Sequence, residues 1–385
     1  MAQKIINYSQ QPLFENLKKS ALMHDLLSMP KLDLHRHLTG SIDAEMAVRI
    51  AAKYDVKLPT YISSELEDML FKQDRVKNLD EYFHPWAVLN RLFISKEAVY
   101  EIVMLSARKA AQDRVLYVEF RTSPRGFLGE NNAFSFEEYV ETLSKSAIDA
   151  QSEFDIIIRF ILGIPRQVFV PIPLIQRNRM FAKMISVILA YGQHFVGVDL
   201  SGNEDIGAEE FEYFFRFAME KGLSVTVHAG ESGPASNVRY AVEHLGASRI
   251  GHGISAAKDE TLLSILAERC CTLEICPTSN KLLGVVSEVE ELPLKMLWQH
   301  NVPFIICSDN PARCRISLSE ELYKVSKAFD LSIHDVEKIV HSSLDSSFAD
   351  SETKRILSLK LGISKRTAGN SADVLKSATE LAPAN

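Results

Sequence analysis

Two histidines, His35 and His37, close a short apolar run near the start of the chain and have a spacing that suits metal binding. Side chains two residues apart on a β-strand point to the same side, so both imidazoles face one region. Converging imidazoles can hold a divalent metal ion. A His-x-His pair also arises by chance, so the rest of the chain must decide between a metal site and an accident.

Further histidines and carboxylates follow the ends of other apolar runs. His228 and Glu231 follow one run, His252 stands between glycines after the next, and Asp309 follows the last. Taken alone, His228 could be a core histidine, His252 a turn residue and Asp309 a helix or turn cap. Taken together, imidazoles and a carboxylate at successive strand ends suit one first-row metal ion, with zinc favoured. The expected ligands are His35, His37, His228 and Asp309.

The elements that would position these residues are short, β-branched runs bounded by Gly, Pro or Asn. They cover residues 31–38, 115–122, 155–164, 195–201, 224–228, 249–251, 272–276 and 303–308. Nearly continuous apolar runs are typical of parallel strands buried on both faces. Helix-period stretches lie between them, which predicts an α/β fold, a (β/α)₈ TIM barrel whose active site lies at the carboxyl ends of the strands. A doubly wound open sheet is the structural alternative.

The chain is expected to form a single domain over residues 1–385, with the barrel over 28–350. Helical patterns fill residues 44–112, between the first two runs, and predict a helical insertion that covers the site. A helix before residue 28 is expected to pack on the outside of the barrel. Residues 366–385 are polar and are expected to form a flexible tail.

Composition narrows the class of protein. The net charge is −7 and no long Lys/Arg block occurs, so no nucleic-acid footprint is visible. No apolar stretch is long and uncharged enough to span a membrane. The five cysteines lack zinc-ribbon spacing, which favours a reduced, cytoplasmic chain. The expected partner is a small molecule, and the sequence does not indicate an oligomeric state.

Several sequence blocks, in their order along the chain, resemble the signature of the adenosine deaminase family. They are His-Arg-His-Leu-Thr-Gly-Ser at 35–41, His-Ala-Gly-Glu at 228–231, Arg-Ile-Gly-His-Gly at 249–253, Glu-Ile-Cys-Pro-Thr-Ser-Asn at 274–280 and Ser-Asp-Asn-Pro at 308–311. The segments 117–124 and 199–204 are similar to the family's second and fourth strands. The other zinc deaminase class carries Pro-Cys-x-x-Cys, which is not matched, because Thr-Ser-Asn follows Pro277.

The resemblance implies a metal-dependent purine nucleoside or nucleotide aminohydrolase. A metal-activated hydroxide would attack C6 of a 6-aminopurine and release ammonia or an amine. Glu231 would be protonated and deliver a proton to ring N1, which requires a desolvated carboxyl. His252 would act as the base for the water, and Asp309 would contact that water as well as the metal. The backbone N–H of Gly202 would donate to purine N3.

Two departures from the family pattern bear on the substrate. Asn310 stands where the family usually has aspartate, and its amide can donate to purine N7 at any pH. Thr39 replaces an aspartate that would repel a 5′-phosphate. The segment Thr122, Ser123, Pro124 and Arg125 resembles the branch that acts on nucleoside 5′-monophosphates. The sequence therefore predicts that adenosine, deoxyadenosine, AMP, dAMP and N6-methyl-AMP are candidate substrates.

Further arginines follow strand ends and would also suit a phosphate: Arg36, Arg313 and Arg315. Any of them could equally make an ordinary ion pair.

Three alternatives stay open. A two-metal amidohydrolase would carry a bridging lysine on the fourth strand, but residues 196–202 contain none. A deaminase of another modified adenine nucleoside, with a carboxylated 5′ extension, would also suit arginines near the pocket. A catalytically dead barrel could serve as a binding or assembly subunit. Ammonia release would separate this last alternative from an enzyme.

Overall fold

Eight parallel strands form one sheet in which each strand pairs with its neighbour in the chain. The computed structural model describes residues 20–71, 76, 79–124 and 133–363. The strands are β1 (Lys31–His37), β2 (Val115–Thr122), β3 (Ile157–Pro165), β4 (Phe195–Ser201), β5 (Ser224–Ala229), β6 (Arg249–His252), β7 (Thr272–Ile275) and β8 (Phe304–Ile306). Nearly all of their residues are buried, as expected for strands covered on both faces.

The barrel closes where the chain leaves β8. The backbone N–H of Asp309 donates to the carbonyl of His35 at 2.8 Å, and the N–H of His37 donates to the carbonyl of Asp309 at 2.8 Å. These bonds bridge the end of the eighth strand to the first. The predicted (β/α)₈ barrel is therefore confirmed, and the open-sheet alternative is wrong.

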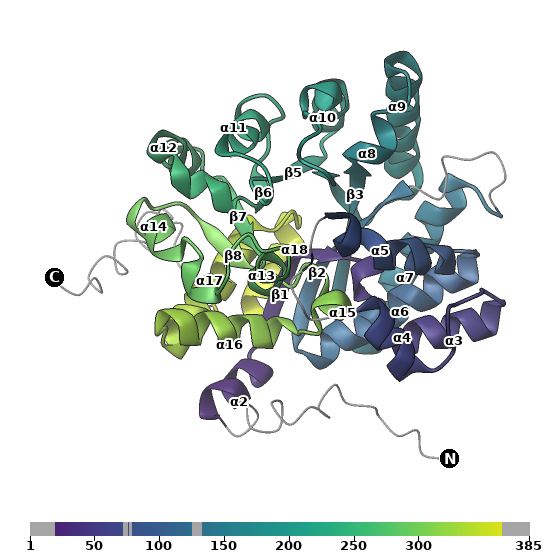
Figure 1. Cartoon of the computed structure of the whole chain (residues 1–385), viewed down its shortest axis with the longest axis horizontal. Helices are drawn as coiled ribbons and strands as arrows, with labels where there is room; N and C mark the ends of the chain where they lie inside the picture. Colours follow the sequence, from purple (N-terminus) through teal and green to yellow (C-terminus); the bar gives the residue numbers. More distant parts are fainter. Residues whose placement is uncertain (1–19, 72–75, 77–78, 125–132, 364–385) are drawn as a thin grey trace.

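Helices surround this barrel (Figure 1). Following β2, they are α7 (Phe136–Phe154), α8 (Arg166–Phe169), α9 (Leu174–Tyr191), α10 (Glu212–Glu220), α11 (Ala235–Glu243), α12 (Glu260–Glu268), α13 (Pro277–Leu282), α14 (Leu294–Gln299), α15 (Pro311–Cys314), α16 (Leu318–Phe329), α17 (Ile333–Ser346) and α18 (Ser351–Lys360). Several of these helices begin with a capping box, in which a serine and an acidic residue satisfy each other's backbone N–H groups. Ser135 with Glu138 and Ser317 with Glu320 are two examples.

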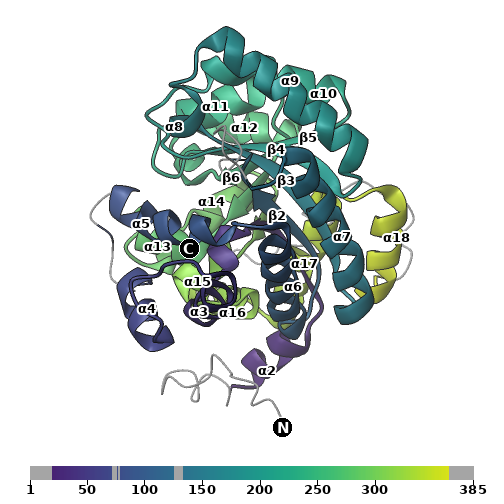
Figure 2. The same cartoon turned by 90° about the vertical axis from the view of Figure 1, so that its right-hand side faces the viewer.

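A helical insertion follows the first strand, as the sequence predicts. It runs from α3 (Ala44–Tyr54) through α4 (Ser63–Leu70) and α5 (Leu79–Leu89) to α6 (Lys96–Gln112). Figure 2 shows α3, α4 and α5 together beside the barrel, whereas α6 lies along α7. α6 thus packs among the outer helices, and α5 is the part of the insertion that reaches the carboxyl ends of the strands.

The ends of the chain add two helices to the barrel. The expected N-terminal helix is α2 (Ala21–Ser28), which packs against α16. Beyond residue 350 the chain continues into α18, where Thr353 contacts Arg159 of β3. The expected tail, 366–385, lies outside the described residues. Among the described helices, none is both long enough and apolar enough to cross a membrane.

Candidate active site

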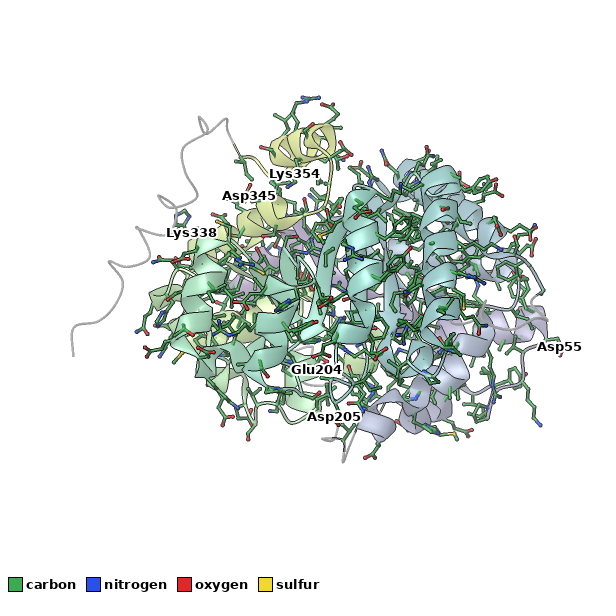
Figure 3. The ribbon with its side chains drawn as sticks, turned by 90° about the horizontal axis from the view of Figure 1, so that it is seen from above. Asp55, Glu204, Asp205, Lys338, Asp345 and Lys354 are labelled. Carbon is green, nitrogen blue, oxygen red and sulfur yellow. The ribbon has the colours of Figure 1, made fainter. Side chains whose placement is uncertain are left out.

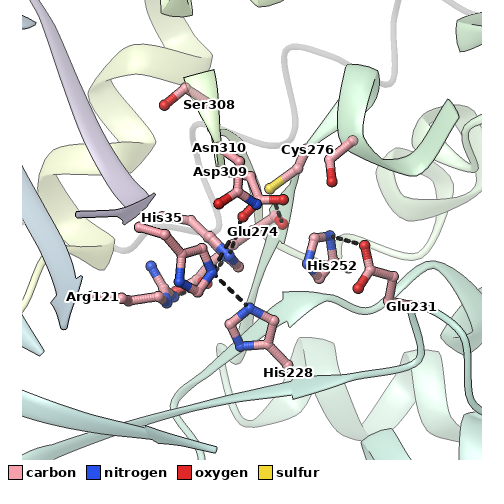
Figure 4. A network of polar contacts seen from close by, with 12 residues as sticks. His35, Arg121, His228, Glu231, His252, Glu274, Cys276, Ser308, Asp309 and Asn310 are labelled. Carbon is pink, nitrogen blue, oxygen red and sulfur yellow. Dashed lines mark hydrogen bonds and ion pairs between the residues drawn. The ribbon is translucent and has the colours of Figure 1, made fainter. Parts of the chain in front are cut away.

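Three histidines and one aspartate converge at the carboxyl ends of β1, β5 and β8. Figure 4 shows His35, His228 and Asp309 of this group. The ring nitrogens of His35, His37 and His228 that face this point lie within 4.8 Å of one another. The Oδ1 atom of Asp309 lies 3.4 Å from His35 Nε2 and 3.3 Å from His37 Nε2. The fold therefore brings all four predicted ligand side chains together.

Buried carboxylates orient two of these imidazoles. His35 Nδ1 lies 2.7 Å from Glu274, and His228 Nδ1 lies 3.0 Å from Asp199. A carboxylate accepts the proton of the nearer ring nitrogen, so each imidazole presents the lone pair of its Nε2 atom to the centre. Arg121 pairs with both carboxylates and balances their charge inside the barrel.

This arrangement fits a divalent cation. The buried atoms His35 Nε2 and Asp309 Oδ1 have no hydrogen-bond partner within the described part of the chain. The Nε2 atoms of His37 and His228 face each other at 3.3 Å. His228 Nδ1 already donates to a carboxylate, so its Nε2 atom carries a lone pair. Lone pairs that face a common centre repel one another unless a cation lies between them. Three imidazoles and one carboxylate are ligands that zinc accepts.

The predicted catalytic pair lies beside this centre. His252 Nδ1 lies 3.4 Å from a carboxyl oxygen of Glu231 and 3.1 Å from the Asn280 side-chain amide. The ring of His252 is 5.0 Å from the ring of His35, measured between centroids. An acid–base pair therefore borders the cluster of metal-ligand candidates.

Backbone contacts hold the turn that carries Glu231. Both carboxyl oxygens of Glu204 accept N–H groups from residues 230, 231 and 232, at 2.6, 2.9 and 2.9 Å. Asn237 adds a side-chain contact to the Glu204 carbonyl at 3.2 Å. Figure 3 shows Glu204 and its neighbour Asp205 at the opposite side of the molecule from Asp345 and Lys354. A further buried carboxylate, that of Glu204, thus fixes the Glu231 backbone.

Burial separates the protonation behaviour of the two catalytic candidates. It raises the pKa of Glu231 well above its usual range, and the negative charges of Asp309 and Glu204 raise it further. Burial also lowers the pKa of His252 well below its usual range, with a further contribution from His35. Both shifts favour the neutral forms, a protonated Glu231 carboxyl and an unprotonated His252 ring, which is the division of roles that general acid–base chemistry needs.

A cavity of about 430 Å³ opens in front of this pair. All of the predicted substrate-binding residues that the structure describes line it: Thr39, Thr122, Ser123, Gly202 and Asn310. Arg125 lies outside the described residues. At Gly202 the backbone is left-handed, with a φ of 92°, and a Cβ atom would fall 2.0 Å from the Gln167 side-chain oxygen, so any other residue would be strained there.

The other arginines proposed to face a phosphate do not line this cavity among the described residues. Arg36 donates to Ser41 at 3.0 Å and pairs with Asp33. Arg315 pairs with Glu67 at 3.0 Å in α4. Arg313 is buried against the ring of Tyr82. Strand-end position alone was a poor guide here, because these long side chains turn away from the cavity. The partners of Arg36 are close in sequence, whereas those of Arg313 and Arg315 are distant.

Sequence reasoning missed the residues that support the site. Asp199 and Glu274 fall inside apolar strands, where a lone charged residue signals a buried partner but does not identify it. Tyr82, Trp86 and Asn90 line the cavity from the insertion. They recur every four residues, at the spacing of one helix face, and that spacing was the available signal.

Comparison with known proteins agrees with the geometry. A family model described as adenosine deaminase matches residues 30–362. An adenosine deaminase of Clostridium perfringens is 31% identical over 343 residues, covering 88% of this chain and 99% of that protein. Two solved structures share the fold at lower identity. Adenine deaminase from Arthrobacter aurescens has a TM-score of 0.75 at 22% identity, covering 92% of this chain and 100% of that one.

The second is the N6-methyl-AMP deaminase from Arabidopsis thaliana, with a TM-score of 0.75 at 23% identity, covering 88% of this chain and 98% of that one. The match of the family model extends from β1 through α18, and so includes the three strand ends, of β1, β5 and β8, that carry the converging histidines and aspartate. The chain belongs to the adenosine deaminase family.

Proposed function

We propose that this protein hydrolyses the 6-amino group of an adenine nucleoside or nucleoside 5′-monophosphate and releases ammonia or an amine. One observation carries the proposal: an acid–base pair, Glu231 and His252, borders the cluster of four candidate metal ligands. The pKa of Glu231 is raised and that of His252 is lowered, as their roles require. Kinship with a bacterial adenosine deaminase over most of both chains supports the same reaction.

The four converging residues would hold one divalent ion, with zinc favoured by the imidazole-rich donor set. Such an ion, when bound, supplies a Lewis acid that brings the pKa of water from about 15.7 down toward 7. His35, His228 and their carboxylate partners keep the donor atoms in place without rearrangement.

The chain's own groups carry the proton transfers. Neutral Glu231 donates its proton to purine N1, which leaves C6 electron-poor and ready for attack by water. His252 accepts the proton that the attacking water loses and returns it to the departing amine. When the C6–N6 bond breaks, the new C6 hydroxyl gives its proton to Glu231, which restores the acid and leaves the 6-oxo purine.

The remaining part of the cavity is lined by apolar side chains, such as Phe93 and Phe134, and by neutral polar groups. Thr39 donates to the Asn90 side-chain oxygen at 3.4 Å, and Thr122 and Ser123 also line the cavity. Hydroxyl and amide groups suit a sugar, and they also donate to a phosphate without repelling it. We therefore keep nucleosides and 5′-monophosphates together as the proposed substrate class.

A side-by-side assay tests the proposal. Purified protein with a measured zinc content is given adenine, adenosine, deoxyadenosine, AMP, dAMP and N6-methyl-AMP, and ammonia or methylamine is measured with the 6-oxo product. Release from at least one nucleoside or nucleotide, at a rate that follows zinc content, is expected. Purine binding without any release would favour a dead barrel, and release from adenine alone would contradict the proposed substrate class.

A further inference from the structure

Tyr82, on α5 of the insertion, reaches the ends of β7 and β8. Its side chain is buried, with 3% of its surface exposed. Its hydroxyl lies 2.9 Å from the hydroxyl of Ser279, 3.0 Å from the Asn310 amide nitrogen and 3.5 Å from Oδ2 of Asp309. One side chain of the insertion thus contacts Asp309 and Asn310, which line the cavity, and Ser279 of α13.

One set of hydrogen-bond directions satisfies all of these groups at once. A phenol has one proton to donate and lone pairs that can accept. The Asn310 amide donates to it, and the Ser279 hydroxyl is free to rotate and donate as well. The phenol proton is then left for the carboxylate of Asp309, the only charged acceptor of the three contacts. Two donors behind a phenol polarise it and strengthen its own donation.

Packing holds the phenol ring in this position. The ring of Trp86, one turn later on α5, stacks on the ring of Tyr82 with 5.4 Å between centroids. The guanidinium of Arg313 lies 5.6 Å from the centre of the Tyr82 ring. The place of the hydroxyl is therefore set by the insertion and by α15 together.

The two oxygens of Asp309 consequently have different neighbours. Oδ1 faces the ring nitrogens of His35 and His37, at 3.4 and 3.3 Å, and Oδ2 faces the Tyr82 hydroxyl. A partner on the second oxygen restricts rotation of the carboxyl group, as carboxylates do for ligating imidazoles.

We propose that Tyr82 is a positioning residue that orients Asp309 and Asn310, so that the helical insertion completes the site instead of only covering it. This inference rests on the proposed function, because it treats Asp309 as a metal ligand and Asn310 as a substrate contact. It assigns to α5 a role in metal affinity as well as in enclosure of the cavity.

The variant Tyr82→Phe removes the hydroxyl and keeps the ring. Its zinc affinity, measured by competition with a chelating dye, is expected to fall about 10-fold or more, as for other outer partners of metal ligands. The kcat on the best substrate of the wild-type protein is expected to fall by a similar factor. Tyr61→Phe is the matched control: Tyr61 also lies in the insertion, but its hydroxyl donates to the Val56 carbonyl, away from the cavity.

A second variant separates positioning from a general loss of folding. If Ser279 acts through the phenol, then Ser279→Ala should weaken zinc binding in the wild-type background and have little further effect in Tyr82→Phe. Equal zinc affinity, within twofold, of Tyr82→Phe and wild type would overturn the proposal. If the wild-type protein releases no amine from any purine, the proposed function fails, yet the zinc measurement still decides the role of Tyr82.

Discussion

His252 and Asp309 both adopt backbone conformations that residues with side chains rarely take. Their φ angles are 64° and 55°, in the left-handed region. Such conformations cost of order 1–3 kcal/mol and persist only where the surrounding structure determines them. For Asp309 the cause is visible, because its N–H and carbonyl both bond to β1 and so turn its side chain toward the histidines. The local strain is part of what brings these side chains to one point.

Glu231→Gln tests the proton donor at this scale. The amide keeps the size of the side chain but cannot deliver a proton to purine N1, so kcat should fall by about 10²–10⁴-fold. Zinc content should stay at the wild-type value, since Glu231 is not among the four ligand candidates. Steady-state ammonia release with zinc analysis on the same samples measures both. The exposed Glu352→Gln serves as control, and a variant at position 231 with near-normal turnover would contradict the assigned role.

Gly40→Ala tests the packing around Asn310. A Cβ atom at position 40 would fall 2.0 Å from the side-chain oxygen of Asn310 and 2.7 Å from its Cγ, so that side chain must move. Overpacking of this kind costs about 1–3 kcal/mol, and we expect kcat/KM to fall about 10-fold or more. In an Asn310→Gly background the same change should cost little more. A full additional loss there would mean that Gly40 matters for some other reason.

Among the elements, α16 carries a carboxyl whose protonation should affect stability. Glu321 is fully buried and accepts from the N–H and the hydroxyl of Thr278 on α13, at 3.2 and 3.0 Å. Burial raises the pKa of Glu321 to about 7. The folded protein thus retains a proton that the unfolded chain loses near pH 4.5. The contribution of Glu321 to the free energy of unfolding is therefore fully present below about pH 4.5, and it is lost as the pH rises through about 7.

Glu321→Gln should remove this dependence. Relative to wild type, the free energy of unfolding of the variant should rise by about 2 kcal/mol between pH 5 and pH 8. Urea unfolding at both pH values, with zinc held constant, measures the difference. Glu290→Gln, an exposed change on the short turn 289–291, controls for the loss of one surface carboxyl. The interpretation fails if the two variants show the same change with pH.

The strands show how far sequence alone reaches. β2 and β4 have the predicted bounds, because buried parallel strands are continuous apolar runs with abrupt polar ends. The same pattern located His35, His37, His228 and Asp309, since strand ends meet at one rim of a barrel. The periodicity of apolar residues indicates only which face of a helix or strand is buried. It does not indicate which side chains that are distant in sequence contact each other. The contacts of Tyr82 with Ser279 and Asn310, and that of Arg315 with Glu67, are of this long-range kind.

At the scale of the whole molecule, the four ligand candidates join distant parts of the barrel. His35 and His37 end β1, His228 lies in β5 and Asp309 follows β8. β1 and β8 lie near opposite ends of the described chain and meet where the barrel closes, whereas β5 lies on the other side of the barrel. One ion would therefore link the two sides. The histidine rings already lie within 5.4 Å of one another, centre to centre. The ligand side chains therefore need to move little when the ion binds. Most of the free energy of metal binding then adds to the stability of the folded state.

Removal of the metal should therefore lower thermal stability. A ligand that binds only the folded state stabilises it by about 4 kcal/mol at a thousandfold excess over its Kd. For a chain of this size that corresponds to a Tm change of about 5 °C. Differential scanning calorimetry at one scan rate, before and after treatment with a chelator and after zinc is restored, measures it. Asp309→Ala should respond much less to the chelator. If the Tm of the wild-type protein changes neither after chelation nor after zinc is added, then no ion links β1, β5 and β8.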